Sequence, residues 1–287
     1  MKVLRTFLSL LGIGTGADPA AKAVNIHASP RVLQTEPDHP VSFGCKVNWF
    51  AIRTTDSASV REVLGLDDPR PANWASGVAA AYEYSRREAE AATVFVSPAV
   101  RGWILVISVD LPYPADASLD YSEQELGRAF RHIFSNLASH FEEVQFFGTY
   151  RVVGFDAWAR ARHGRVERIF SFRDGEVLAN EGPQSLEEAQ LGFLDLGART
   201  PEEATSFIYE ADTSQNERSA ESARSPIPDE QDTIDLAGLW SLDPTQLNKI
   251  EDAAGVGFVA SLPHDRSRSE ATEAQPFSAS GVATGCE

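Results

Sequence analysis

Residues 155–172 read FDAWARARHGRVERIFSF, and they decide the fold class of this 287-residue chain. Two β-rich runs meet at His163-Gly164, where glycine, and histidine more often than most residues, tolerate the positive φ of a tight loop. Asp174-Gly175 follows the second run, and Asp-Gly is a strong signal for a two-residue hairpin turn. The segment therefore predicts consecutive antiparallel strands.

The loop at His163-Gly164 fixes a register that can be checked on paper. The pairs that follow from it are Phe155–Phe172, Ala157–Phe170, Trp158–Ile169, Arg160–Glu167, Ala161–Val166 and Arg162–Arg165. Small residues then oppose large ones on one face, and an opposite-charge pair lies on the other. A slip of one residue would destroy both patterns. The register places Arg168 with Phe155, Phe170 and Phe172, and places Asp156 with Trp158 on the opposite face.

Other periodic segments extend this hairpin into a mixed fold. Strands are expected at 46–53, 93–97, 103–109 and 144–147, and helices at 74–87 and 121–141. Successive apolar residues in the strands at 93–97 and 103–109 indicate that both faces are covered. The predicted fold class is α+β, with a largely antiparallel sheet of six or seven strands built from hairpins and helices packed on it.

Composition divides the chain into five parts. Residues 1–40 read as a weakly structured or signal-like leader, and 41–210 as the α+β core domain. A stretch almost without apolar side chains, 211–229, predicts a disordered linker. We expect 230–262 to be a helical segment that packs on the core, followed by a disordered acidic tail at 263–287.

Charge is distributed unevenly along the chain. Residues 1–180 hold 21 acidic and 19 basic residues, whereas residues 181–287 hold 21 acidic and 6 basic residues. Phosphate backbones repel such a polyanionic surface, so nucleic acid is not the expected partner. A basic protein is the partner that this charge suits.

The N-terminus leaves the compartment open between two interpretations. Lys2 and Arg5 flank a short apolar run, and Ala21-Lys22-Ala23 fits a small-x-small cleavage site. We expect a cytoplasmic protein; the alternative is export through a weak N-terminal signal peptide. No stretch approaches the roughly 20 apolar residues of a membrane-spanning helix.

Motifs for common chemistries are missing from the sequence. The glycines of 12–16 have no strand before them and no Lys-Ser/Thr after them, so they do not predict a phosphate loop. No Gly-x-Ser-x-Gly signature is present. His132 and His140 lie eight apart, whereas metal ligands on one helix prefer spacings of three or four. The sequence therefore predicts neither a cofactor nor a metal site.

Three residues are the candidates for catalysis. Arg168, on an apolar strand face, must find a carboxylate or carbonyls, because burying its charge alone is costly. It could bind an anion in a pocket, or it could be a structural residue held by a carboxylate from a covering helix. Asp156 beside Trp158 could have the raised pKa of a general acid. His163 at the loop is the third candidate.

The hairpin also carries the only basic cluster in the sequence. The candidate binding residues are Trp158, Arg160, Arg162 and Arg165. With no catalytic constellation, the leading hypothesis is a non-catalytic bacterial interaction protein, for example an immunity-type protein that masks a basic partner. The alternatives are a hydrolase-type enzyme that uses Asp156 and Arg168 near Trp158, and an exported or envelope protein.

Overall fold

The computed structural model describes residues 32–83, 91–118, 120–217 and 224–263. These described residues belong to one compact unit. Most of the predicted leader and of the predicted acidic tail therefore lies outside the described residues. Residues 32–40 are described, and the Asp38 carboxylate accepts hydrogen bonds from the backbone N–H groups of Trp74 and Ala75 at 2.6 and 3.0 Å. This part of the predicted leader is tied to the core.

Nine antiparallel strands form one sheet in the order β2-β9-β3-β4-β1-β5-β6-β7-β8. The strands are β1 (Val47–Arg53), β2 (Asp67–Asn73), β3 (Ala92–Val96), β4 (Trp103–Ser108), β5 (Glu143–Tyr150), β6 (Phe155–Arg162), β7 (Arg165–Arg173), β8 (Glu176–Glu181) and β9 (Val256–Leu262). The α+β class and the antiparallel sheet are confirmed, although the sheet is larger than the six or seven strands expected.

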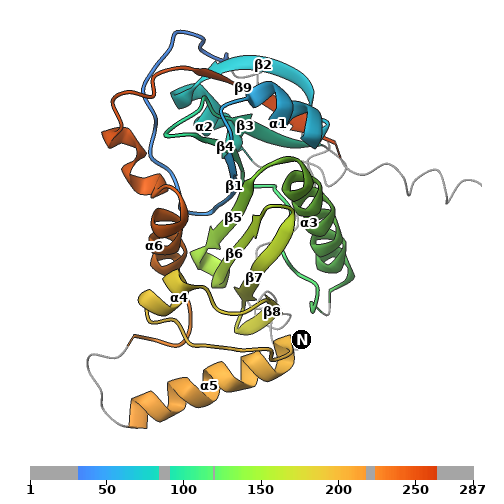
Figure 1. Cartoon of the computed structure of the whole chain (residues 1–287), viewed down its shortest axis with the longest axis vertical. Helices are drawn as coiled ribbons and strands as arrows, with labels where there is room; N and C mark the ends of the chain where they lie inside the picture. The colour runs from blue at the N-terminus through green and yellow to red at the C-terminus, as the bar shows by residue number, and fades with distance from the viewer. Residues whose placement is uncertain (1–31, 84–90, 119, 218–223, 264–287) are drawn as a thin grey trace, which may run out of the picture. The chain divides into compact units, whose positions relative to one another are not determined.

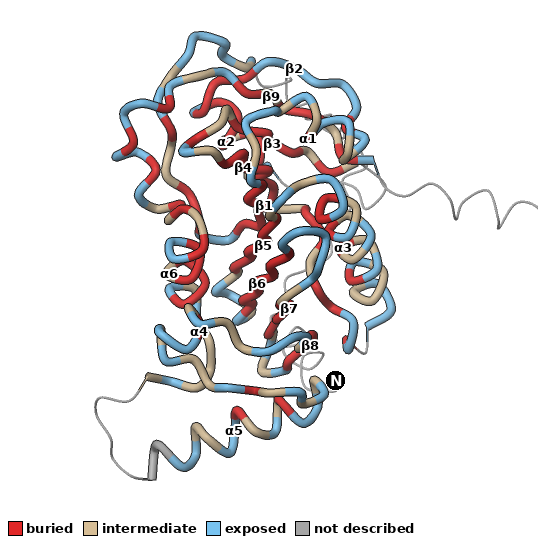
Figure 2. Tube along the Cα trace, viewed as in Figure 1, coloured by how far each residue is buried: buried red, intermediate tan, exposed pale blue. Residues whose placement is uncertain are grey.

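Helices cover both faces of this sheet (Figure 1). The helices are α1 (Ser57–Leu64), α2 (Trp74–Ala81), α3 (Tyr121–His140), α4 (Leu186–Gln190), α5 (Pro201–Glu217) and α6 (Glu230–Trp240), with short 3₁₀ helices η1 (Arg151–Val153) and η2 (Pro244–Lys249). Side chains of α1 and α3 join the core on one face, and side chains of α2, α6 and η2 join the core on the other. The central strands are consequently buried on both faces, as Figure 2 shows.

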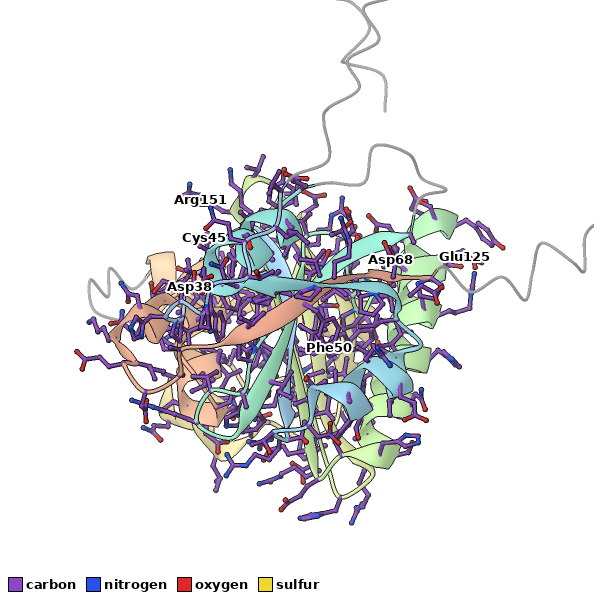
Figure 3. All side chains as sticks on the ribbon, turned by 90° about the horizontal axis from the view of Figure 1, so that it is seen from above. Asp38, Cys45, Phe50, Asp68, Glu125 and Arg151 are labelled. Carbon is purple, nitrogen blue, oxygen red and sulfur yellow. The ribbon has the colours of Figure 1, made fainter. Side chains whose placement is uncertain are left out.

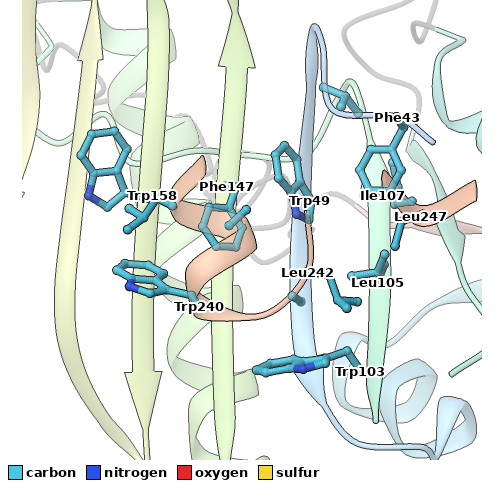
Figure 4. Close-up of a cluster of buried hydrophobic side chains, with 14 of the residues drawn as sticks. Phe43, Trp49, Trp103, Leu105, Ile107, Phe147, Trp158, Trp240, Leu242 and Leu247 are labelled. Carbon is cyan, nitrogen blue, oxygen red and sulfur yellow. The ribbon is translucent and has the colours of Figure 1, made fainter. Parts of the chain in front are cut away.

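Aromatic side chains build both cores. On the α6 face Trp49 stacks on Phe147 with ring centroids 5.2 Å apart, and Phe147 contacts Trp240 at 5.6 Å (Figure 4). On the α3 face Phe130 contacts Phe146 at 4.9 Å. Neighbouring residues of one strand point to opposite faces, so the aromatic pair Phe146-Phe147 supplies both cores at once.

Several predicted boundaries were wrong. The segment 230–262 is not helical throughout, because its end forms β9, which lies between β2 and β3 in the sheet. The predicted linker began at residue 211, but α5 continues to Glu217 before the undescribed residues 218–223. Residues 224–229 are described, and Arg224 and Asp229 make side-chain contacts with α6. Helix α2 ends at Ala81 rather than at 87.

The predicted hairpin register was right only at its tip. Pairs Arg162–Arg165 and Ala161–Val166 occur as expected, but Glu167 is an extra residue on β7, and Arg160 pairs with Arg168. A β-bulge of this kind shifts every later pair by one position. Trp158 therefore pairs with Phe170, and Asp156 with Phe172. The bulge moves Arg168, Phe170 and Phe172 to the face that carries Asp156, Trp158 and Arg160.

Both edges of the sheet are protected against strand addition. Edge strand β2 contains Pro69 and Pro71, which lack the N–H group that a ladder needs. At the other edge the backbone of β8 is already bonded: Thr205 of α5 accepts from the Val177 N–H, and the Ala117 N–H donates to the Leu178 carbonyl. A partner protein is therefore not expected to bind by extending the sheet.

Candidate functional site

Arg168 lies in a buried ion pair with Glu188 of α4. Its Nε donates to Glu188 Oε1 at 3.0 Å, and the two side chains are only 5% and 2% exposed. Its Nη1 donates to Asn180 Oδ1 at 2.8 Å and to the carbonyls of Glu181 and Gly182. Of the two interpretations of Arg168, this geometry is that of a structural arginine held by a covering helix.

The local sequence of α4 explains how Glu188 reaches this position. Ser185 caps the helix, and the Ser185–Glu188 capping box fixes Glu188 at the third helical residue. Glu188 Oε2 accepts from the Ser185 N–H at 2.7 Å, while Oε1 also accepts from Trp158 Nε1 at 2.8 Å. One carboxylate therefore satisfies the helix end, the tryptophan and Arg168 together.

Arg160 joins the same buried layer. Its guanidinium lies 4.5 Å from the Trp240 ring centroid, and it forms ion pairs at 3.4 Å with Glu167 and with Glu187. The sequence predicts Arg160–Glu167 as an ordinary cross-strand pair at an exposed, basic hairpin tip. In the structure the Arg160 side chain is only 8% exposed. Arg160 holds α4 and α6 onto the sheet and is not available to a partner.

The pocket beside Arg168 is small. Trp158, Phe170, Phe193 and Arg168 are among the residues that line it, and its cavity volume is about 30 Å³. A volume of this size leaves room for a few water molecules. The geometry here supports packing rather than the chemistry of a hydrolase.

Asp156 faces α6 rather than a pocket. Thr233 donates a hydrogen bond to Asp156 Oδ1 at 3.2 Å, and Asp156 is 2% exposed. Burial raises the pKa of Asp156 to about 8; the Thr233 hydrogen bond opposes this shift, and the negative charges of Asp229 and Glu230 add to it. A raised pKa was expected here, yet Asp156 lines neither of the two pockets described.

We predict that Asp156→Asn stabilises the protein increasingly as pH rises. The folded-state pKa of about 8 lies above the value of about 3.9 for an unfolded aspartate, so the folded state keeps a proton that the unfolded state releases. Stability of the wild type therefore falls as pH rises from about 4 to about 8. Urea unfolding at several pH values should show the gap between variant and wild type widening over that range, to a few kcal/mol. A gap that stays constant would show that Asp156 keeps an ordinary pKa.

The third catalytic candidate, His163, is remote from Asp156. His163 adopts φ 50° in the hairpin loop, at the far end of β6 from Asp156. Seven residues of extended strand span roughly 23 Å, so the two side chains cannot act on one small substrate. Arg162 pairs with Glu167 at 2.8 Å and Arg165 is exposed beside the loop. The structure therefore does not bring the three candidates together.

A larger pocket opens where β1, β5 and β6 meet beside the end of β7. Its cavity volume is about 220 Å³. Lys46, Tyr113 and Arg173 contribute polar groups to it, and the sequence singled out none of them because they come from three distant segments. Cys45 lies at this end of the sheet beside Arg151 (Figure 3). Partial burial and the hydrogen bond with Glu230 raise the pKa of its thiol, which disfavours a nucleophilic thiolate.

Two further findings concern the described residues as a whole. No group of His, Cys, Asp and Glu side chains among them is arranged to hold a metal ion. No helix in this part of the chain has both the length and the apolar character that crossing a membrane requires.

Comparisons with protein-family models, with curated proteins and with solved structures found no match.

Proposed function

We propose that this protein is a non-catalytic interaction protein whose acidic C-terminal part recruits a basic protein partner. The observation that carries the proposal is the surface of α5. Glu202, Glu203 and Glu210 are exposed on it, and the helix contains no basic residue. No described basic side chain forms an ion pair with these three carboxylates. Glu203 Oε2 accepts from the Thr200 N–H at 2.9 Å, whereas the charges of Glu202 and Glu210 are open to a partner.

The basic residues that flank α5 are used within the fold. Arg199 stacks over Phe207, 3.7 Å from the ring centroid, and donates to the Leu196 carbonyl at 2.9 Å. Arg224 forms an ion pair with Asp232 and lies 4.7 Å from the Phe193 ring centroid. Arg199 offsets part of the Glu203 charge, but Glu202 and Glu210 keep the surface of α5 negative. Such a potential raises the association rate with a positive surface.

The buried ion pairs of Arg160 and Arg168 support binding rather than catalysis, because these charges are already used within the fold. Arg168 is held by Glu188 of α4, and Asp156 hydrogen-bonds with Thr233 of α6. The kind of protein that suits these features is an immunity-type protein in the bacterial cytoplasm. Such a protein masks a basic partner protein by binding to it. Nucleic acid does not suit this surface, because its phosphates carry the same charge sign.

A capture experiment with matched variants tests this proposal. Wild-type protein, the α5 variant Glu202→Gln/Glu203→Gln/Glu210→Gln and a control variant Glu62→Gln/Asp67→Asn/Glu142→Gln are immobilised and exposed to extract from the native source. Both variants remove three exposed carboxylates, but the control residues lie outside α5. Proteins retained at low salt are identified by mass spectrometry.

We expect wild type and control to retain the same basic protein and the α5 variant to retain much less of it. Neutralising three charges on a recruiting surface weakens long-range attraction, and added salt should reproduce the loss. Equal retention by all three proteins, or retention of no basic protein, would refute the recruiting role of α5.

A further inference from the structure

The larger pocket has a rigid floor that is formed before any ligand binds. Asn48 Nδ2 donates to the Leu111 carbonyl at 2.7 Å, and the rings of Tyr113 and Phe155 pack with centroids 4.6 Å apart. Gly148 lets these groups approach, because a Cβ there would lie 2.4 Å from Asn48 Oδ1. A site that is already ordered loses less entropy when a ligand binds.

Two cationic side chains, Lys46 and Arg173, line this pocket. Arg173 Nη1 donates to the Tyr113 hydroxyl at 2.6 Å and pairs with Glu123 of α3. Arg173 Nε is buried without a hydrogen-bond partner, although Asp174 Oδ2 lies 3.5 Å away. The Lys46 backbone N–H donates to Thr149 Oγ1 at 3.2 Å, and its ammonium has no ion pair with a described residue. Lys46 therefore supplies the uncommitted positive charge of the site.

The remaining lining is largely apolar. Val109, Val153 and Phe155 supply it, together with the faces of Tyr113 and Tyr150. A ligand that suits this lining needs an apolar body and a single negative charge. A dianion such as a phosphate monoester fits less well, because Glu123 already neutralises Arg173 and would repel a second negative charge.

We infer that this pocket binds a small monocarboxylic acid with an aromatic or branched aliphatic body. Its carboxylate pairs with Lys46 and approaches Arg173, and its body packs against Phe155 and the valines. Charge-assisted hydrogen bonds to a carboxylate are about twice as strong as neutral ones. The site lies at the strand ends near Cys45 and is separate from α5, so this inference does not depend on the proposed protein partner.

Isothermal titration with four probes tests the inference on the full chain. Benzoate and 3-methylbutanoate represent the aromatic and the branched acids, benzamide is the uncharged isostere of benzoate, and inorganic phosphate represents the dianion. We expect one or both acids to bind, and benzamide and phosphate to bind at least about tenfold more weakly, which is about 1.4 kcal/mol.

Two variants localise the binding. Lys46→Asn removes the positive charge from the pocket, and asparagine tolerates the φ of 55° at this position. The control is Lys249→Asn, which removes the other lysine among the described residues at an exposed position on η2. Val153→Phe fills the pocket without changing its charge. Binding of the acid should fall roughly tenfold in Lys46→Asn, should be lost in Val153→Phe, and should be unchanged in Lys249→Asn.

Three results would overturn the inference. They are failure of both acids to bind, equal binding of benzoate and benzamide, and equal affinity of the Lys46→Asn and Lys249→Asn variants. Lys46 is exposed, so its replacement leaves the fold intact and keeps the test decisive even if Val153→Phe does not fold.

Discussion

Glu188→Gln is expected to lower the free energy of unfolding by about 3–5 kcal/mol, because it leaves the Arg168 charge buried without its carboxylate. Arg168 is 5% exposed, so water cannot replace the lost partner. The same change puts an amide where Trp158 Nε1 and the Ser185 N–H need an acceptor. Chemical denaturation of wild type and variant at one pH measures the loss.

An exposed ion pair provides the control for this measurement. Glu125→Gln breaks the pair with Arg128 on α3, whose side chains are 37% and 54% exposed, and should cost under about 1 kcal/mol. The double variant Arg168→Met/Glu188→Leu should recover part of the stability lost in Glu188→Gln, because replacing both charges removes the unpaired one. Recovery stays incomplete, since Trp158 Nε1 and the Ser185 N–H still lack their acceptor. Equal losses in Glu188→Gln and Glu125→Gln would mean that Arg168 reaches solvent.

Phe170→Ala is expected to destabilise the protein by about 3–5 kcal/mol, the usual cost of emptying a buried phenylalanine site. Phe170 is 3% exposed, and its ring centroid lies 4.4 Å from that of Trp158. Its cross-strand neighbour is Trp158 rather than the Ala157 expected from the unbulged register. Thermal and chemical unfolding both report this loss.

Arg162→Ala is the matched comparison on the same hairpin. The Arg162 side chain is 44% exposed and pairs with Glu167, so its removal should cost under about 1 kcal/mol. Similar losses from Phe170→Ala and Arg162→Ala would contradict the assignment of the two faces. Trp158 fluorescence should also change in Phe170→Ala, because that variant removes the aromatic ring that packs beside Trp158.

The hairpin shows how far its sequence predicts its structure. The loop at His163-Gly164 and the tip pairs follow from the turn residues, because a tight turn sets the local register. The bulge at Glu167 does not follow, because the pattern of small residues opposite large ones favoured the register without a bulge. The bulged register instead pairs Trp158 with Phe170 and Ala157 with Ser171. Its consequence was large, because one extra residue moved Arg168 and Phe170 to the face of Trp158.

Long-range partners explain most of what the sequence left undetermined. Val256–Leu262 has no turn linking it to a neighbouring strand, and its pairing with β3 joins segments more than 150 residues apart. Periodicity alone could not place it in the sheet. The Ser185 cap was predictable, but the pairing of Glu188 with Arg168 depends on how α4 packs against β7.

The pocket residues Lys46, Tyr113 and Arg173 illustrate the same limit. They lie at the start of β1, in the loop after β4 and at the end of β7, so only the sheet order brings them together. No spacing in the sequence marks them as a group. The one sequence feature that sets Lys46 apart is the rarity of lysine. The described residues contain only two lysines, Lys46 and Lys249.

The association rate with the captured basic partner, measured by stopped-flow over a range of salt concentrations, tests the recruiting role of α5 most directly. From about 0.01 M to about 1 M salt the screening length falls from about 30 Å to about 3 Å. Wild type should associate at least about tenfold more slowly at the higher salt. The Glu202→Gln/Glu203→Gln/Glu210→Gln variant should start slower and change less. Identical rates and identical salt dependence for the two proteins would contradict the account.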